Sequence, residues 1–221
     1  MLPMNLRERI IRESVRLFSV KGFLGTSLKD ILEATETSKG GFYNHFRSKE
    51  ALFSAVLSES RKIWRDKNLA GMDERADPLN KIERLLDNYR SRYLRDTDDF
   101  PGGCVFIGLA VELSGRRPHL ASEVREGFVG LKVMIARHLD QAGKAGQIRS
   151  DVDTEELAEV IFAGMLGASL MYSLERSTPN LDRAVDSLIH LLRSLAAAQT
   201  GKQTFGQRGN KQPGHQLFKT P

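Results

Sequence analysis

The chain has 221 residues, of which 40% are hydrophobic and 28% charged, with a formal net charge of +5. This length supports one core or two small ones, and this polarity excludes an integral membrane protein. The only cysteine, Cys104, excludes an intrachain disulfide framework and a cysteine-based metal cluster. Because the first residues lack the segments of a signal peptide, we expect a cytoplasmic protein.

The positive charge lies at the two ends of the chain. Residues 1–50 carry nine Lys and Arg against six Asp and Glu, and residues 196–221 carry four basic residues and no acidic one. A basic N-terminal segment suits the neutralisation of DNA phosphates. The last segment, 199–221, is rich in Gly, Gln, Lys and Thr, which predicts a disordered basic tail. It either adds non-specific attraction to DNA or has no role.

The first elements in chain order are three helices. A helix is expected over residues 4–20, ended by Gly22. Ser27 and Asp30 have the spacing of a capping box, which predicts a second helix from about residue 27. Ser38 then starts a third helix after a tight turn. Two short helices joined in this way, the second carrying basic and hydroxyl side chains, are typical of a helix-turn-helix.

Residues 7–53 closely resemble the DNA-binding domain of TetR/AcrR-family transcriptional regulators. The residues that carry the resemblance, over about a fifth of the chain, are Ile11, Leu17-Phe18, Lys21-Gly22-Phe23, Thr26-Ser27, Asp30-Ile31, Lys39-Gly40, Phe42-Tyr43, His45-Phe46 and Ser48-Lys49-Glu50. The resemblance implies an all-α protein: a three-helix DNA-binding domain, a fourth connecting helix, and a C-terminal domain that dimerises and binds a small-molecule inducer. It does not identify that molecule.

The sequence departs from the family pattern at two places. Thr35-Glu36-Thr37 stands where Ala-Gly-Val is common, so the turn lacks the glycine that adopts positive φ without strain. We expect strain at Glu36 and an anion near DNA. Gly41 stands where a hydroxyl side chain is frequent, which removes one contact but lets the backbone approach the duplex.

The DNA contacts are predicted from position in the motif. Lys39, Gly40 and Gly41 would reach base edges, although Lys39 would equally suit a phosphate. The predicted phosphate-binding residues are Thr26, Tyr43, His45 and Lys49. The alternatives are that Tyr43 is partly in the core and that Lys49 is an ordinary surface residue. Phe42 and Phe46 are assigned to packing. The complete predicted DNA-binding set is Thr26, Ser27, Ser38, Lys39, Gly40, Gly41, Tyr43, His45 and Lys49.

The remaining elements are also helical. A connecting helix from Ser48 to about residue 66 precedes a polar break near residue 68, and Asp77-Pro78 starts the next helix. Further helices are expected over residues 104–114, 118–142 and 154–175, the last with a capping box formed by Asp153 and Glu156. The expected domains are 1–50 for DNA binding, 51–198 for effector binding and dimerisation, and the tail 199–221.

Two apolar stripes near the C-terminus predict helix pairing. Leucines and a valine recur at steps of four and three after Pro179, and small residues on the preceding helix would permit close approach. The periodicity fits either a four-helix dimer interface or closure of the monomer's own core, and the family resemblance favours dimerisation. The predicted interface residues are Ala163, Gly164, Gly167, Ala168, Leu181, Val185, Leu188, Leu192 and Leu195.

The effector pocket is predicted from aromatic and methionine side chains on helices that the family fold gathers around a cavity. Such linings suit a neutral or anionic apolar ligand. The predicted residues are Trp64, Tyr89, Tyr93, Cys104, Phe106, Phe128, Met134, Met165 and Tyr172.

Cys104 follows Gly102-Gly103 at the start of an apolar helix, where the helix dipole would favour the thiolate. This makes it a candidate thiol-based sensor of electrophiles or redox state. The Gly-Cys-apolar run ending in Glu112 also resembles a subset of TetR-like regulators whose effector domains respond to reactive electrophiles or small unsaturated compounds. The alternative is a buried structural cysteine that acts as a small hydrophobe.

The leading functional hypothesis is a dimeric repressor that a small molecule releases from a palindromic operator, and an activator is its variant. An enzyme would use Cys104 as nucleophile with His119 or His138 as base, and a third class is a protein-interaction module without DNA binding. His45 has no further ligand at metal-binding spacing around it, and the other histidines are scattered. No metal site and no cofactor is predicted.

Overall fold

The computed structural model describes residues 4–72 and 77–197, so the predicted tail 199–221 lies outside the described residues. Within these ranges the chain forms nine α-helices and one π-helical segment, and no strand, which confirms the all-α expectation. The elements are α1 (Leu6–Lys21), α2 (Leu28–Ala34), α3 (Lys39–Tyr43), α4 (Lys49–Asn68), α5 (Pro78–Asn88), η1 (Tyr89–Leu94), α6 (Val105–Leu113), α7 (Pro118–Lys144), α8 (Thr154–Glu175) and α9 (Thr178–Ser194).

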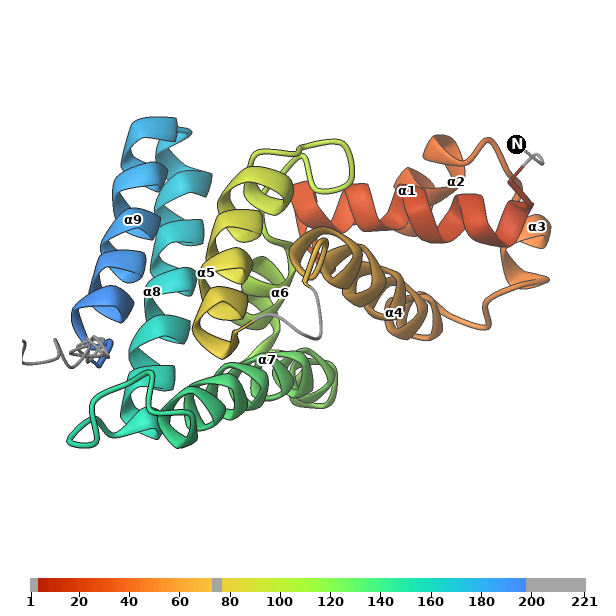
Figure 1. The fold of residues 1–221 in the computed structure, drawn as a ribbon. Coiled ribbons are helices and arrows are strands. Elements are labelled where there is room, and N and C mark those ends of the chain that lie inside the picture. The colour runs from red at the N-terminus through yellow and green to blue at the C-terminus, as the bar shows by residue number, and fades with distance from the viewer. Residues whose placement is uncertain (1–3, 73–76, 198–221) are drawn as a thin grey trace, which may run out of the picture.

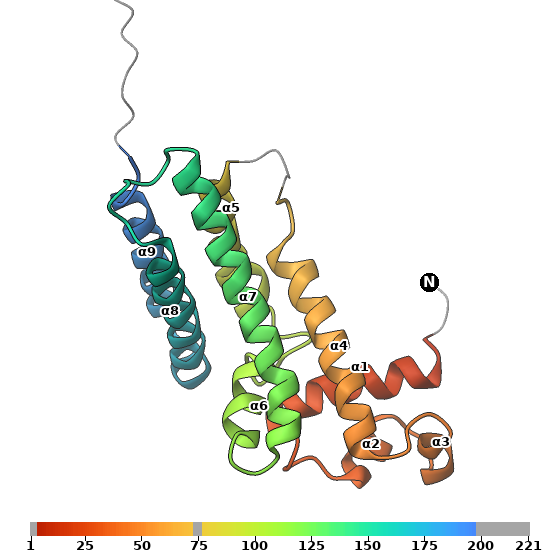
Figure 2. The same ribbon diagram turned by 90° about the horizontal axis from the view of Figure 1, so that it is seen from below.

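The helices form an elongated molecule with two different ends. α1, α2 and α3 lie at one end and the antiparallel pair α8 and α9 at the other, with α4 to α7 between them (Figures 1 and 2). α4 leaves the N-terminal end and runs beside α7 toward the middle of the molecule (Figure 2). The connecting helix therefore joins the N-terminal helices to the middle layer.

Side-chain caps start the three N-terminal helices. Asn5 and Glu8 form a capping box, which begins α1 at Leu6 rather than at the expected residue 4. The capping box predicted for Ser27 and Asp30 is confirmed. The Ser38 hydroxyl accepts from the Gly41 amide at 3.1 Å and fixes the start of α3. Each short helix is thus specified by residues within its own first turn.

An aromatic cluster holds α1 against α4. The Phe23 and Phe53 rings meet edge to face with centroids 5.1 Å apart, and Phe18 packs against both. All three side chains are buried. The first half of α4 therefore packs with α1 and shares the core of the N-terminal helices. The expected domain boundary at residue 50 lies at the start of α4, before this shared part. A single cluster of buried side chains continues from here into the C-terminal helices.

The C-terminal helices follow the predicted order with two differences. α5 does not simply end, because residues Tyr89–Leu94 continue it as a π-helical turn that the apolar periodicity does not reveal. α8 spans the expected 154–175, but the Asp153 carboxylate accepts from the amides of Glu155 and Glu156 in place of the reciprocal capping box. Asp77 caps α5 with Pro78 at its first position, as expected.

The apolar seam on α9 closes the core of the protomer. Leu181, Val185 and Leu192 are at most 2% exposed, so they pack inside one chain rather than across a dimer interface. Leu188 and Leu195 are half-buried. α9 lies so close to α8 that a Cβ on Gly164 would come within 2.6 Å of the Leu188 side chain. The α9 part of the predicted dimer interface is corrected here, because its leucine and valine stripe packs mainly against α8 and α5 of the same chain.

The outward side of α8 carries a second apolar stripe. Val160, Leu170, Met171 and Leu174 are between 47% and 72% exposed, and Ala163 and Gly167 lie between them. By length and composition α8 is long and apolar enough to cross a membrane, yet it packs along α7 and α9 within this bundle. Its exposed stripe needs a separate explanation.

Candidate nucleic-acid interface and effector cavity

The second helix of the helix-turn-helix presents its polar side chains to solvent. Lys39, Tyr43 and His45 are exposed, whereas Phe42 and Phe46 are buried beneath them, as assigned from the sequence. The Tyr43 ring, 53% exposed, packs edge to face on Phe42 with centroids 5.4 Å apart. The buried rings thus form a base that fixes the exposed face.

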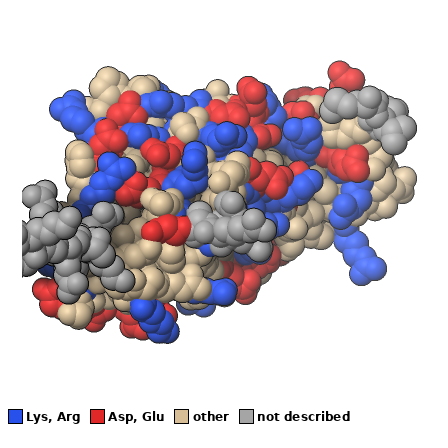
Figure 3. Space-filling view, viewed as in Figure 1, with Lys and Arg blue, Asp and Glu red and all other residues tan. Residues whose placement is uncertain are grey.

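Lys and Arg side chains project from the end of the molecule formed by α1 to α3, where Asp and Glu side chains also lie (Figure 3). Lys39 makes no ion pair with any described residue. Lys29 on α2, by contrast, pairs with Glu33 one turn later. The ammonium group of Lys39 is therefore free to contact DNA.

The turn between α2 and α3 contains the strain expected at Glu36. Its φ is +48°, in the left-handed region that glycine adopts at low cost, and its side chain is exposed beside α3. The Thr37 amide donates to the Leu32 carbonyl at 3.1 Å and closes the turn. A Cβ on Gly41 would lie 2.4 Å from the Thr37 hydroxyl, so the missing side chain also lets the turn pack on α3.

Two of the side chains that were predicted to bind phosphates bind backbone carbonyls of the protein instead. Thr26 is fully buried and its hydroxyl donates to the Gly22 carbonyl at 2.6 Å, so this side chain does not reach a phosphate. The Lys49 ammonium donates to the carbonyls of Phe23 at 2.8 Å and Thr26 at 2.7 Å, and it lies 4.3 Å from the Phe23 ring centroid. Burial lowers the pKa of Lys49. Lys49 thus connects α4 to the loop after α1, because its ammonium binds the carbonyls of that loop rather than a phosphate.

Ser27 and Ser38 remain exposed, although each hydroxyl already serves as a helix cap. The Ser27 hydroxyl donates to Asp30 at 2.5 Å, and Lys21 binds the same carboxylate. These contacts hold the pKa of Asp30 well below its usual range. The start of α2 is accordingly fixed by charge-assisted bonds and the start of α3 by a neutral hydroxyl cap before any DNA binds.

A cavity of about 420 Å³ lies between α4, η1, α6, α7 and α8. Seven of the nine predicted pocket residues line it, and their side chains are mainly apolar. These are Trp64, Tyr89, Cys104, Phe106, Phe128, Met134 and Met165. The volume and the apolar lining suit a small ligand.

Two predicted pocket residues lie outside this lining. Tyr93 sits one layer behind it, stacked on Tyr89 with ring centroids 5.5 Å apart. Tyr172 instead borders a smaller groove of about 290 Å³ between α8 and α9. The reason is the position along the helix: Tyr172 lies on nearly the same face of α8 as Met165, but about two turns farther along, past the end of the cavity.

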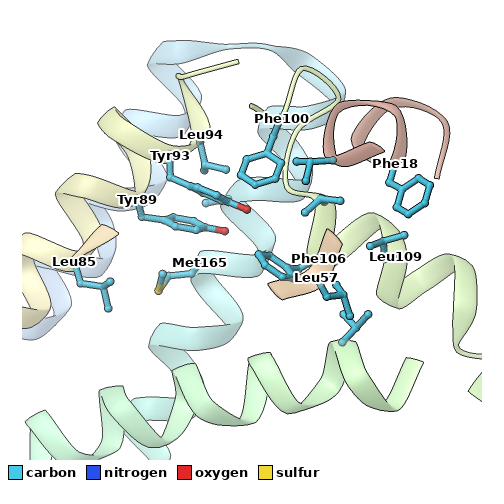
Figure 4. Close-up of a cluster of buried hydrophobic side chains, with 14 of the residues drawn as sticks. Phe18, Leu57, Leu85, Tyr89, Tyr93, Leu94, Phe100, Phe106, Leu109 and Met165 are labelled. Carbon is cyan, nitrogen blue, oxygen red and sulfur yellow. The ribbon is translucent and has the colours of Figure 1, made fainter. Parts of the chain in front are cut away.

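A buried polar cluster of Tyr93, Cys104 and Ser169 lies at one side of the cavity. The Tyr93 hydroxyl donates to the Cys104 sulfur at 3.3 Å, and the buried Ser169 lies next to Tyr89 and Cys104. In Figure 4 the Tyr89 and Tyr93 side chains lie side by side with their hydroxyls pointing the same way. The π-helical turn sets this arrangement, because both tyrosines belong to η1.

Burial raises the pKa of the Cys104 thiol, and hydrogen bonds from Tyr93 and from backbone amides of α6 only oppose this effect. The start of α6 thus favours the thiolate as expected, but desolvation outweighs this contribution and the pKa of the thiol rises. The histidines considered as bases lie elsewhere: His119 is 3.5 Å from Glu50, and His138 bonds Gln141 at 3.3 Å.

The sequence analysis did not identify the polar groups at the cavity. Arg61 and Arg65 on α4 and Glu126 on α7 border it. The Arg61 guanidinium also donates to the Glu123 carbonyl and so ties α4 to α7. Charged residues on amphipathic helices are normally solvated, and only the packing of α4 on α7 reveals their position.

An exposed helix-turn-helix followed by a helical domain with a cavity defines a DNA-binding regulator with an effector domain. The family profile described as "Bacterial regulatory proteins, tetR family" matches residues 10–56, and "Tetracyclin repressor-like, C-terminal domain" matches residues 78–188. The chain belongs to the TetR family of bacterial transcriptional regulators, whose members bind DNA.

Similar proteins agree with this assignment. A TetR transcriptional regulator from Chloroflexus aurantiacus J-10-FL has a structure with a TM-score of 0.80 at 30% identity, covering 86% of this chain and 96% of its own. The repressor DhaR of Mycobacterium sp. (strain GP1) is 29% identical over 80% of this chain and 87% of that protein. The repressor NemR of Escherichia coli K12 is 25% identical over 86% and 95% of the two chains.

Proposed function

We propose that the protein is a homodimeric repressor that binds a palindromic operator and is released from it by a small apolar molecule bound in the cavity. The names of DhaR and NemR as repressors support repression over activation. The proposal includes a cytoplasmic location and no catalytic activity. It assigns Lys39, Gly40 and Gly41 to the base edges and Tyr43 and His45 to the phosphates.

The observation that carries the proposal is that a recognition surface open to DNA and an apolar cavity belong to the same helical framework. α4 connects them, because Phe53 packs with α1 at one end of the helix and Trp64 lines the cavity near the other. A ligand that binds two arrangements of α4 with different affinity would shift the population between them.

The exposed stripe on α8 supports the dimer. Its apolar members recur at intervals of three and four residues from Val160 to Leu174, and Ala163 and Gly167 allow close approach. Ala184 on α9, half-buried, lies beside Gly167 and Met171 of this stripe in the groove between α8 and α9. A two-fold axis through this face would pair α8 and α9 with their copies in a four-helix arrangement.

The dimer face is tested by Leu174→Lys, with Val111→Lys as the control. The two residues are 72% and 75% exposed, but Val111 lies on α6 away from the stripe. Sedimentation velocity should show a dissociation constant raised at least about tenfold for Leu174→Lys and unchanged for Val111→Lys. Equal dimerisation by the two variants would remove α8 from the interface.

The function as a whole is tested by selecting bound sequences from randomised duplexes with the purified protein at two salt concentrations. We expect a palindromic consensus with half-sites about one helical turn apart and affinity that falls steeply with salt. Binding without a consensus would contradict operator recognition. The absence of any binding would contradict the proposal itself.

A further inference from the structure

The C-terminal end of α6 holds the loop that enters the helix-turn-helix. The Glu112 carboxylate accepts from the amides of Phe23 at 2.7 Å and Leu24 at 2.9 Å. Gly22, just before them, has a φ of +71°, and a Cβ at this position would lie 2.5 Å from the carboxylate. The loop between α1 and α2 therefore wraps closely around one side chain of the effector domain.

The other end of α6 is also joined to α1. The Gly102 amide donates to the Ser19 hydroxyl at 3.3 Å, and a Cβ on Gly102 would lie 1.8 Å from the Ser19 carbonyl oxygen. Two residues later Cys104 caps α6, and both Cys104 and Phe106 line the cavity. α6 has nine residues, a length of roughly 13 Å, so the cavity wall and Glu112 belong to one short rigid rod.

Lys49 holds the same loop from the side of α4. Its ammonium binds the carbonyls of Phe23 and Thr26, while Glu112 binds the amides of Phe23 and Leu24. A negative charge thus faces the N–H groups and a positive charge faces the C=O groups, which is the favourable orientation for both. α4, α6 and the start of α2 meet at this loop, whose position fixes where the helix-turn-helix lies.

We propose that Glu112 is a positioning residue that couples the cavity to the helix-turn-helix. A ligand that displaces the start of α6 would move its Glu112 end, and the loop before α2 would follow. This inference rests on the proposed function and adds α6 to the connection through α4. Coupling is reciprocal, so a duplex bound at the helix-turn-helix must also alter the cavity.

Reciprocity permits a test without knowing the effector. Trp64 is the only tryptophan of the chain and lines the cavity, so its fluorescence reports on the cavity. The duplex from the selection experiment is titrated into the wild type, Glu112→Gln, Glu112→Asp and Glu159→Gln, with a scrambled duplex as the optical control. Glu159 pairs with Lys132 between α8 and α7, so its variant also loses one ionic contact, far from the loop.

In the wild type and Glu159→Gln, saturation with duplex should change the Trp64 emission. Glu112→Gln, which is shaped like glutamate but uncharged, should bind the duplex about tenfold more weakly and lose at least about four-fifths of the emission change at saturation. Glu112→Asp keeps the charge but is shorter by one methylene, so it should behave in the same way. Circular dichroism would establish that the variants are folded.

Three results would overturn the proposal: unchanged Trp64 emission in the wild type on duplex binding, a full emission change in Glu112→Gln, or failure of both Glu112 variants to fold. The last would make Glu112 a residue of stability rather than of coupling. Failure of the wild type to bind any duplex is a different result, because it would reject the proposed function itself.

Discussion

The helix-turn-helix and the cavity present their functional side chains in opposite ways. Lys39 and Tyr43 lie on the surface above fully buried rings, within a segment whose helices start at local caps. The cavity collects side chains from five elements that extend from Arg61 to Leu166, and most of them are half-buried. A recognition surface needs a rigid base, whereas an effector site is a gap in packing that can be filled.

The aromatic residues of the two regions also differ in how they pack. Phe18, Phe23 and Phe53 fill the space between α1 and α4. Phe106 and Phe128 border open space instead, and their packing would be completed by a ligand. The first set therefore determines stability, and the second set determines what the protein binds.

Replacing a ring from each set should separate these roles most strongly. Phe53→Ala should lower the free energy of unfolding by about 3–5 kcal/mol, because it opens a cavity in a fully buried cluster. Phe128→Ala, half-buried at the effector cavity, should cost roughly 1–2 kcal/mol. Urea unfolding followed by circular dichroism measures both. Equal losses would mean that the cavity lining is as tightly packed as the N-terminal core.

The sequence predicted the N-terminal region well because its signals are local. Ser27 and Ser38 each specify a helix start through a bond to an amide three residues away. The resemblance to a family supplied the rest of that region. Lys49 was misassigned because the carbonyls of Phe23 and Thr26 reach its ammonium only when α4 packs against the loop. Thr26 was misassigned because its hydroxyl bonds the Gly22 carbonyl within the loop and its side chain is buried.

Farther along the chain, the apolar periodicity predicted the helices but not which surfaces their apolar faces pack against. A heptad stripe on α9 fits burial in the protomer or in a dimer equally well, and the structure places Leu181 and Val185 in the protomer. The sequence shows the exposed stripe on α8 less clearly than the stripe on α9, because α8 is apolar on most sides. The π-helical turn at Tyr89 and Tyr93 has no sequence signal of its own, since it depends on packing among α4, α5 and α9.

Lys49→Met tests the contact between α4 and the loop that enters the helix-turn-helix. Loss of its bonds to Phe23 and Thr26 should lower the free energy of unfolding by about 2 kcal/mol. The salt dependence of DNA affinity should stay as in the wild type, because this ammonium does not reach a phosphate. Filter binding at several salt concentrations measures the slope, and a slope reduced by about one would restore the phosphate role.

Lys39→Ala tests whether the exposed surface reads bases. Affinity for the selected duplex should fall about tenfold, with a smaller loss on scrambled DNA and no change in stability. Lys29→Ala is the matched control, since Lys29 is exposed on α2 and already pairs with Glu33. Competition binding with selected and scrambled duplexes gives the ratio. The same loss on both would make Lys39 a phosphate contact.

The smallest expected effect concerns Cys104, the one nucleophile at the cavity. Burial raises the pKa of its thiol, so alkylation by iodoacetamide should be slow at neutral pH and reach half its maximal rate above the ordinary value of 9.0. Tyr93→Phe removes the hydroxyl that donates to the sulfur and should move that midpoint further upward. Mass spectrometry of the labelled protein across pH measures both. A half-maximal alkylation rate below pH 8 would identify an activated thiolate. Cys104 would then be able to react covalently with a ligand in the cavity.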